Sequence, residues 1–456
     1  MSAPPPAAAP ADRAARTVST GRLGFWMAVA LVAGNMIGSG VFLLPASLAP
    51  YGVNGLAGWL LSAAGAVTLA LVFAALSRAF PRDGGLYVYT RVAFGALPAF
   101  VVAWGYWVSV WVGNAAIATG GVSYLSTLVP AIATVPGASV AVTLALLWLL
   151  TFVNCVGVRA AGWVQAVTTV LKLLPLLAVA LVGILLVFLR RPMPGLAEGP
   201  PLSLDGTTAA ATLTLWALLG LESATVPADK VENPERTVPR ATMVGTAVTA
   251  VLCAAACGAV LLLVPGSQLA ISSAPFADAI RPLWGEGAAT LVVVFAAISA
   301  FGALNGWILL QGELPRAMAR DGVFPKVFAR ESKRGTPAFA FIFTSALVTL
   351  LVLANAHSTM VEIFTFMILL STTACLVAYL VCSLALLDLM RRGQLPGIGR
   401  PAPWLAGAGV LGAGYSLWAL FGAGRDALLW GFVLLLVAVP VYALSRRDRS
   451  TLGEQG

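Results

Sequence analysis

Charged residues are scarce in this chain. Only 10% of its 456 residues are Asp, Glu, Lys or Arg, and 59% are apolar, whereas soluble domains carry about 25% charged residues. The mean hydropathy is +0.92. This composition excludes a water-soluble globular fold and predicts an integral membrane protein with many spans.

Histidine and cysteine are also scarce. The single histidine, His357, falls in a predicted external loop, and the five cysteines all lie in apolar segments: Cys155, Cys253, Cys257, Cys375 and Cys382. Two thiols on one helix face and a lone histidine make no metal site. The sequence also has no ATP-binding loop and no catalytic constellation. We therefore predict no metal, no cofactor and no enzymatic activity.

The Lys and Arg residues punctuate the apolar segments. The formal net charge is +9, but the basic residues do not gather on one amphipathic face, so no nucleic acid partner is expected. Residues 1–21, rich in Ala and Pro, are predicted to be a disordered cytoplasmic tail, and residues 446–456 a second tail. No cleavable signal peptide is expected, because the first apolar segment is long and starts late.

A spanning helix needs about 20 apolar residues, and the chain holds twelve such segments. They lie near residues 22–48, 53–77, 94–128, 137–157, 161–189, 206–228, 241–264, 284–314, 337–355, 359–389, 402–421 and 426–445. Most Lys and Arg residues fall in loops on one side, and the opposite side receives Arg190, Arg191, Arg281 and Arg425. The positive-inside rule then places both termini in the cytoplasm.

The first span is interrupted by glycine. Residues 34–42 contain Gly34, Gly38, Ser39 and Gly40, which weaken helical pairing where unpaired backbone groups are costly. Such a break is tolerated where it lines a cavity, and the amides after Gly38 would form the positive end of a second half-helix that holds a carboxylate. A glycine-rich helix-packing face is the structural alternative.

The sixth span is interrupted as well. It contains Gly220 and, two residues later, Glu222 at membrane depth. Breaks in spans one and six predict an inverted five-plus-five repeat whose broken helices enclose one site. The expected units are residues 22–189 for the first repeat, 206–389 for the second, and 402–445 for the last two spans.

Several stretches together resemble the amino acid–polyamine–organocation superfamily, and within it the antiporters that exchange arginine for agmatine, ornithine for putrescine or lysine for cadaverine. The matching stretches are residues 34–45, 84–89, 106–114, 159–167, 215–224, 231–239, 273–276 and 321–325. The resemblance implies an all-α leucine-transporter fold of twelve transmembrane helices with broken helices one and six. It also implies a bacterial inner-membrane location and a homodimer.

The resemblance assigns the carboxylate of the substrate to the first break, at Met36, Ser39 and Gly40. It assigns the contact with the distal end of the substrate to Asn114, and an apolar wall of the pocket to Leu219. The further pocket residues are Ser109, Val110, Ile117 and Ser371. For Asn114, an interhelical hydrogen bond is the structural alternative.

Four aromatic residues resemble gates of the family. Trp216 and Trp307 match tryptophans that stack on the substrate, where a cation over an indole gains about 0.5–2 kcal/mol. Both sit well inside their spans, unlike interfacial anchors. Tyr106 and Tyr379 match gating tyrosines. In the tenth span, which holds Ser371 and Tyr379, the sequence of residues 371–375 departs from the antiporter pattern.

Two ionisable residues lie deep in spans, where a charge is expensive. Glu222 matches a proton-sensing residue of the antiporters, with a structural ion pair or cap as the alternative. Lys172 departs from the antiporters and resembles the lysine of proton-coupled amino acid transporters; it is either a proton carrier or a fixed charge that joins spans. Glu313 is expected to form a salt bridge with Arg316.

Three functions follow. The first is exchange of a cationic amino acid, arginine-like, for its decarboxylated amine, agmatine-like, by alternating access in a lipid bilayer without ATP. The second is a proton-coupled permease for neutral or varied amino acids that uses Lys172. The third is an amino acid sensor that does not transport, which the short predicted tails disfavour.

Overall fold

The computed structural model describes residues 24–82, 84–156, 158–196, 199–226, 228, 231–356, 359–397 and 403–443. For Ser39, residues 158–166 and Leu196 it describes the backbone alone. The predicted tails at residues 1–21 and 446–456, and His357, lie outside these ranges.

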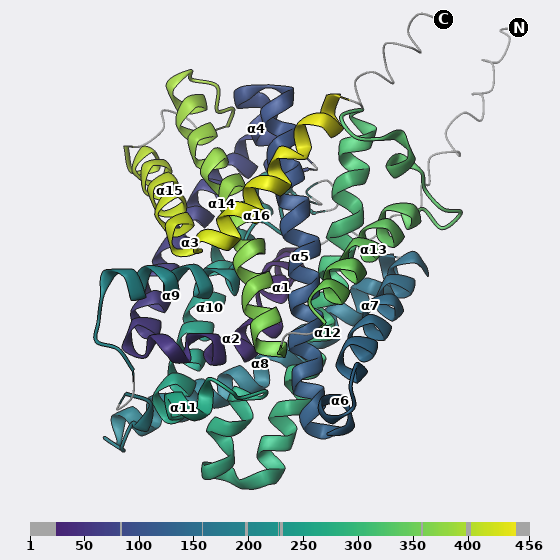
Figure 1. Cartoon of the computed structure of the whole chain (residues 1–456). Helices are drawn as coiled ribbons and strands as arrows, with labels where there is room; N and C mark the ends of the chain where they lie inside the picture. Colours follow the sequence, from purple (N-terminus) through teal and green to yellow (C-terminus); the bar gives the residue numbers. More distant parts are fainter. Residues whose placement is uncertain are drawn as a thin grey trace, which may run out of the picture.

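Helices make up the bundle (Figure 1). The longer helices are α1 (Phe25–Met36), α2 (Ser39–Leu48), α3 (Val53–Ala79), α4 (Leu86–Phe94), α5 (Ala96–Leu128), α7 (Ala138–Val156), α8 (Val158–Phe188), α9 (Leu204–Trp216), α10 (Pro234–Leu263), α12 (Pro275–Arg320), α13 (Ala338–Ala354), α14 (Met360–Arg391), α15 (Pro403–Gly422) and α16 (Arg425–Leu436). The short ones are η1 (Ala49–Tyr51), α6 (Ala131–Thr134), η2 (Pro194–Leu196), α11 (Gly266–Leu269) and η4 (Lys326–Ala329).

The helices have the length and composition of membrane spans. Among the described residues, ten helical segments are long and apolar enough to cross a membrane, and α13 is a shorter apolar helix. Each predicted span overlaps one of these helices or, for the sixth, α9. The all-helical, multi-span prediction is therefore confirmed, whereas the number of twelve crossings stays a prediction.

The eighth span begins earlier than predicted. The eighth span was expected at residues 284–314, but α12 begins at Pro275 and bends at Gly285, whose φ of +79° is non-helical. The backbone there needs a left-handed conformation that glycine adopts at little cost. The two limbs of α12 form the bend visible at the lower edge of Figure 1. Apolar periodicity alone does not reveal such an extension.

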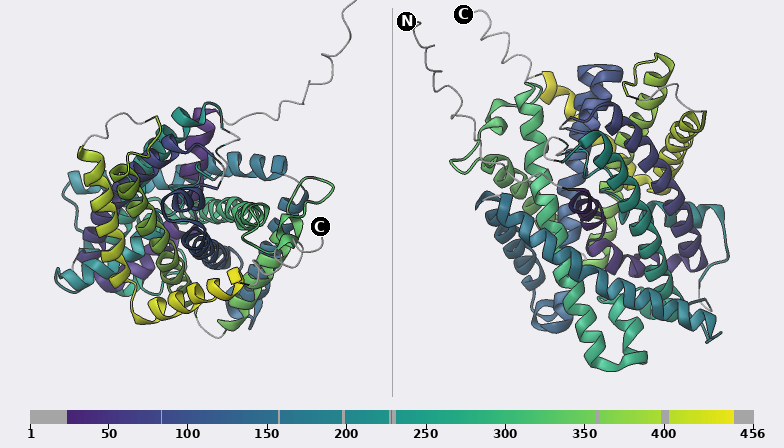
Figure 2. Two further views of the ribbon diagram at one scale, coloured as in Figure 1. Left: turned by 90° about the horizontal axis from the view of Figure 1, so that it is seen from above. Right: turned by 180° about the vertical axis from the view of Figure 1, so that it is seen from behind.

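The helices separate into inner and outer ones. In the most apolar window of α5, 78% of the residues are buried, and in that of α7 only 22%. Outer helices present large apolar side chains, such as Leu181, Ile184 and Phe188 of α8, which suit contact with lipid. Figure 2 shows the bundle from above and from behind.

Small residues bring two helices of the site close together. At Gly302 of α12, an added Cβ atom would lie 2.1 Å from Oγ1 of Thr168 on α8. Close approach through small residues is how helices pack in membranes, where lipid is as apolar as the helix surface. This contact places Lys172, one turn after Thr168, near Trp307 of α12.

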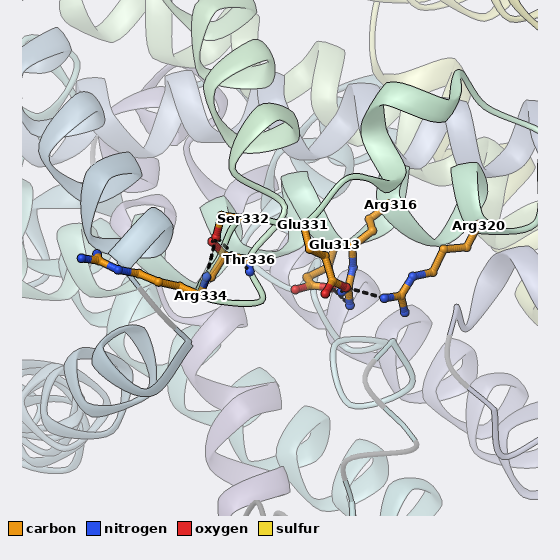
Figure 3. Close-up of polar contacts among 7 residues, drawn as sticks. All are labelled: Glu313, Arg316, Arg320, Glu331, Ser332, Arg334 and Thr336. Carbon is orange, nitrogen blue, oxygen red and sulfur yellow. Dashed lines mark hydrogen bonds and ion pairs between the residues drawn. The ribbon is translucent and has the colours of Figure 1, made fainter.

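Ion pairs hold the loop that follows α12 (Figure 3). Arg316 pairs with Glu313 at 2.5 Å, as the sequence predicted, and Glu331 accepts from both Arg316 and Arg320. Arg320 is largely exposed, and exposed ion pairs contribute little to stability. The pair of Arg320 with Glu331 therefore contributes little, whereas the side chains of Arg316 and Glu313 are only 14% and 17% exposed.

Candidate functional site

The first interruption lies between α1 and α2. Helix α1 ends at Met36, Ile37 and Gly38 are extended, and α2 begins at Ser39. The predicted break is therefore present. The first N–H groups of α2 have no partner within their own helix, and with the helix dipole they favour an anionic group at this point.

The carbonyl groups at the end of α1 accept hydrogen bonds from α8 and α12. Lys172 Nζ donates to the carbonyl oxygens of Gly34 at 2.6 Å and Ile37 at 2.7 Å, and Trp307 Nε1 donates to that of Asn35 at 3.0 Å. An unpaired carbonyl at membrane depth costs several kcal/mol. These two side chains therefore make the interruption of α1 tolerable.

The second interruption follows α9. Residues 217–226 form a succession of turns in place of a helix, and Gly220 has a φ of +100°. The side-chain amide of Asn35 donates to Ser223 Oγ at 3.0 Å. The predicted break in the sixth span is therefore present, and it lies beside the first.

A small cavity lies between the two interruptions. It encloses about 30 Å³, which holds about one or two water molecules. Its walls are Asn35, Met36, Gly38, Ser109, Val110, Gly113, Ile117, Trp216, Leu219, Trp307, Ser371 and Cys375. A molecule as large as an amino acid therefore fits only after these walls move apart.

The two tryptophans are interior walls. Trp216 packs edge-to-face on Phe364, with ring centroids 5.5 Å apart. The Trp216 ring also lies directly against Gly40, where an added Cβ atom would come within 1.9 Å of Cζ3. Trp216 and Trp307 are each 8% exposed, so neither is an interfacial anchor. Their role as gates stays a prediction.

Glu222 forms one cluster with both predicted gating tyrosines. Its Oε1 accepts from the hydroxyl of Tyr106 at 2.6 Å and its Oε2 from that of Tyr379 at 2.5 Å. All three side chains are buried. Protonation of Glu222 would remove the charge that strengthens both hydrogen bonds, and it would turn one acceptor oxygen into a donor, so that one of the bonds reverses its direction. The three helical segments that carry them are thus joined through a titratable group.

Asn114 is placed differently from the other predicted contacts. Val110, Gly113 and Ile117 line the cavity, but Asn114 does not. Its Nδ2 instead donates to Oε1 of Gln311 on α12 at 2.6 Å. The structure therefore shows the interhelical hydrogen bond that was the structural alternative, to a residue that the sequence did not single out.

The structure brings most of the predicted pocket together. The predicted residues that line the cavity are Met36, Ser109, Val110, Ile117, Trp216, Leu219, Trp307 and Ser371. Gly40 lies against Trp216, and nothing is described of the Ser39 side chain. Asn35 and Cys375 line the cavity without having been predicted. The position of Cys375, one turn after Ser371 on the same face of α14, is a signal that could have identified it.

Comparison with known proteins covers nearly the whole chain. A family model described as amino acid permease matches residues 23–443. The chain is 34% identical to the cadaverine/lysine antiporter of Escherichia coli (strain K12) over 443 residues, which is 95% of this chain and 97% of that protein. It is 30% identical to the putrescine transporter PotE of Haemophilus influenzae over 409 residues, 90% of this chain and 93% of the relative.

The chain belongs to the amino acid permease family. This result confirms the predicted superfamily, and it supports a membrane transporter of an amino acid or amine rather than an enzyme. Among the described residues of the permease, no group of three or more His, Cys, Asp or Glu side chains could hold a metal ion.

Proposed function

We propose that this permease exchanges a basic amino acid for the amine that its decarboxylation produces. The observation that carries the proposal is the start of α2 beside a cavity walled by Trp216 and Trp307. Amides at the start of α2 suit a carboxylate, and the two indole faces suit an organic cation. One site would then accept both members of the exchange pair in turn.

The names of the relatives support a particular pair. A cadaverine/lysine antiporter and a putrescine transporter are similar to this chain over nine tenths or more of their length. We therefore propose lysine and cadaverine as the first pair to test, with arginine and agmatine, which the sequence motifs favour, as the second.

The proposed architecture is the leucine-transporter fold. It comprises an inverted five-plus-five repeat over residues 22–189 and 206–389, followed by two spans at 402–445, with twelve crossings and both termini in the cytoplasm. The interruptions after α1 and α9 support it, because broken helices at corresponding positions of two repeats are typical of this class. We further propose a bacterial inner-membrane location and a homodimer.

A second candidate function is proton-coupled uptake. Lys172 supports it, because its amine lies fully buried against the backbone of the broken α1. A change in its charge would alter its hydrogen bonds to Gly34 and Ile37, and hence the break beside the cavity. Glu222 is the second titratable group through which protons could act.

Reconstituted vesicles distinguish the candidates. Exchange predicts that labelled lysine enters only vesicles loaded with lysine or cadaverine, with or without a pH gradient. Proton coupling predicts uptake into empty vesicles under an inward proton gradient, and its loss in Lys172→Ala. Binding without either form of transport would favour the sensor. Loss of lysine binding in Trp307→Ala, with binding unchanged in the lipid-facing control Trp430→Phe, would support the assignment of the pocket.

A further inference from the structure

Gln311 joins α12 to its neighbours through its main chain. The residue one turn later is Pro315, which has no N–H to donate to the Gln311 carbonyl group. Trp107 Nε1 of α5 donates to this oxygen at 3.1 Å and Thr344 Oγ1 of α13 at 3.4 Å. The proline thus creates a free acceptor at Gln311, and both neighbouring helices use it.

The side chain of Gln311 makes the same two connections. Its Nε2 donates to Ser345 Oγ at 2.9 Å and to the carbonyl oxygen of Phe341 at 3.4 Å, both on α13. Its Oε1 accepts from Asn114 Nδ2 of α5 at 2.6 Å. Gln311 and Asn114 are both fully buried, so water does not compete for these groups.

The carbonyl group of Phe341 decides which way both amides face. A carbonyl oxygen only accepts, so Gln311 must turn its nitrogen towards α13 and its oxygen towards α5. Asn114 must then present its nitrogen to Gln311. The arrangement leaves Oδ1 of Asn114 without a hydrogen-bond partner among the described residues.

An unpaired buried acceptor is unfavourable and unusual in a native structure. Asn114 lies on the face of α5 that the cavity-lining residues Val110, Gly113 and Ile117 mark out. Asn114 does not line the closed cavity, so a ligand would reach its Oδ1 only after the walls of the cavity separate. A ligand that donates a hydrogen bond to Oδ1 would remove the free-energy cost of the unpaired acceptor. A ligand group that only accepts hydrogen bonds, or that is apolar, would not.

We propose that Gln311 is a positioning residue that sets the substrate class of this site. By occupying the amide nitrogen of Asn114, it leaves Oδ1 as the polar group for the distal end of the substrate, which must therefore carry a hydrogen-bond donor such as an ammonium. This inference rests on the proposed function. The inference extends the proposed function in two ways. It explains why the distal group of the substrate is a hydrogen-bond donor, and it assigns the selectivity for that donor to α12 and α13.

The test compares the binding of two amino acids of equal carbon chain. Lysine carries the distal ammonium and norleucine lacks it, so the ratio of their Kd values in the purified full-length protein measures recognition of that group. The contribution of the two indoles to this ratio is the same in the wild type and in variants of Gln311. Gln311→Met frees the Asn114 amide to rotate. We expect it to weaken lysine binding about tenfold while norleucine binding changes little.

Two further variants separate positioning from folding. Gln311→Glu keeps an acceptor towards Asn114, so the preference for lysine should return at least in part. Ser345→Ala loosens the anchor of Gln311 and should reduce the preference less than Gln311→Met does. Ser383→Ala removes a buried hydroxyl that bonds within α14 and should leave the Kd ratio unchanged.

The outcomes of these binding experiments distinguish failure of the inference from failure of the proposed function. An unchanged lysine-to-norleucine ratio in Gln311→Met, or an equal loss of both ligands, overturns the inference. If Gln311→Met does not fold, an unchanged ratio in Ser345→Ala together with a complete loss of the lysine preference in Gln311→Glu overturns it as well. The proposed function fails separately, if the wild-type protein binds no basic amino acid or amine at all.

Discussion

The ammonium nitrogen of Lys172 lies 2.6 Å from the carbonyl oxygen of Gly34, near the end of α1. The same nitrogen lies 2.7 Å from the carbonyl oxygen of Ile37, just beyond that end. A cation is favoured here, because the C-terminal end of a helix carries partial negative charge. Lys172 therefore supports the break at which the proposed carboxylate site begins.

Lys172→Met should destabilise the protein and stop exchange. Each backbone carbonyl left unpaired at membrane depth costs several kcal/mol, and the break would lose its shape. We expect a lower thermal unfolding midpoint and at least about a tenfold lower exchange rate. Lys326→Met, at an exposed lysine, serves as the control. Wild-type stability and exchange in Lys172→Met would show that the hydrogen bonds are not needed.

Glu222→Gln should remove the pH dependence of exchange. In the wild type, protonation removes the negative charge that strengthens the hydrogen bonds from Tyr106 and Tyr379, and it reverses one of them. The three segments then separate more easily, and exchange should be faster at low pH. Glutamine cannot titrate, and the rate should stay flat between about pH 5 and 8. Initial rates of exchange in vesicles of matched internal and external pH measure this.

Asp426→Asn neutralises an exposed carboxylate and should keep the wild-type profile. Tyr106→Phe and Tyr379→Phe each remove one donor to Glu222. Because they share one acceptor group, their effects should not add in the double variant. Strict additivity, or a wild-type pH profile in Glu222→Gln, would contradict the role of the cluster.

Gly40→Ala should abolish substrate binding. The new methyl group would lie 1.9 Å from the ring of Trp216, so the indole must leave its place on the cavity wall. We expect at least about a tenfold weaker Kd for the substrate and a lower unfolding midpoint. Adding Trp216→Leu should restore stability but not binding. Gly414→Ala, at a helical glycine in open space, should change neither.

Modification of Cys375 should block exchange. Its thiol lines the cavity, so a small thiol reagent that enters an open state would fill the site. Bound substrate should slow inactivation, and Cys375→Ala should be resistant. Cys253 is buried elsewhere, so Cys253→Ala should remain sensitive. Equal sensitivity of Cys375→Ala and the wild type would exclude this residue from the pathway.

The sequence by itself determined the membrane class, the helical spans and both interruptions. Long apolar runs predict the segments that are buried in the membrane, and Gly38 and Gly220 weaken the helical pairing of the segments that contain them. The sequence motifs also led to most of the cavity walls, including Trp216 and Trp307. For Glu222, the cost of an acid at membrane depth was enough to single it out.

Only the tertiary structure decided which groups meet. Tyr106 and Tyr379 donate to the same carboxyl group, Lys172 donates to the end of α1, and Asn114 donates to Gln311. All three contacts depend on the packing of helices that are far apart in the chain. Apolar periodicity gives the face of a helix but not its partner, because lipid and a neighbouring helix are equally apolar. Gln311 escaped notice for that reason: its role comes from contacts with α5 and α13.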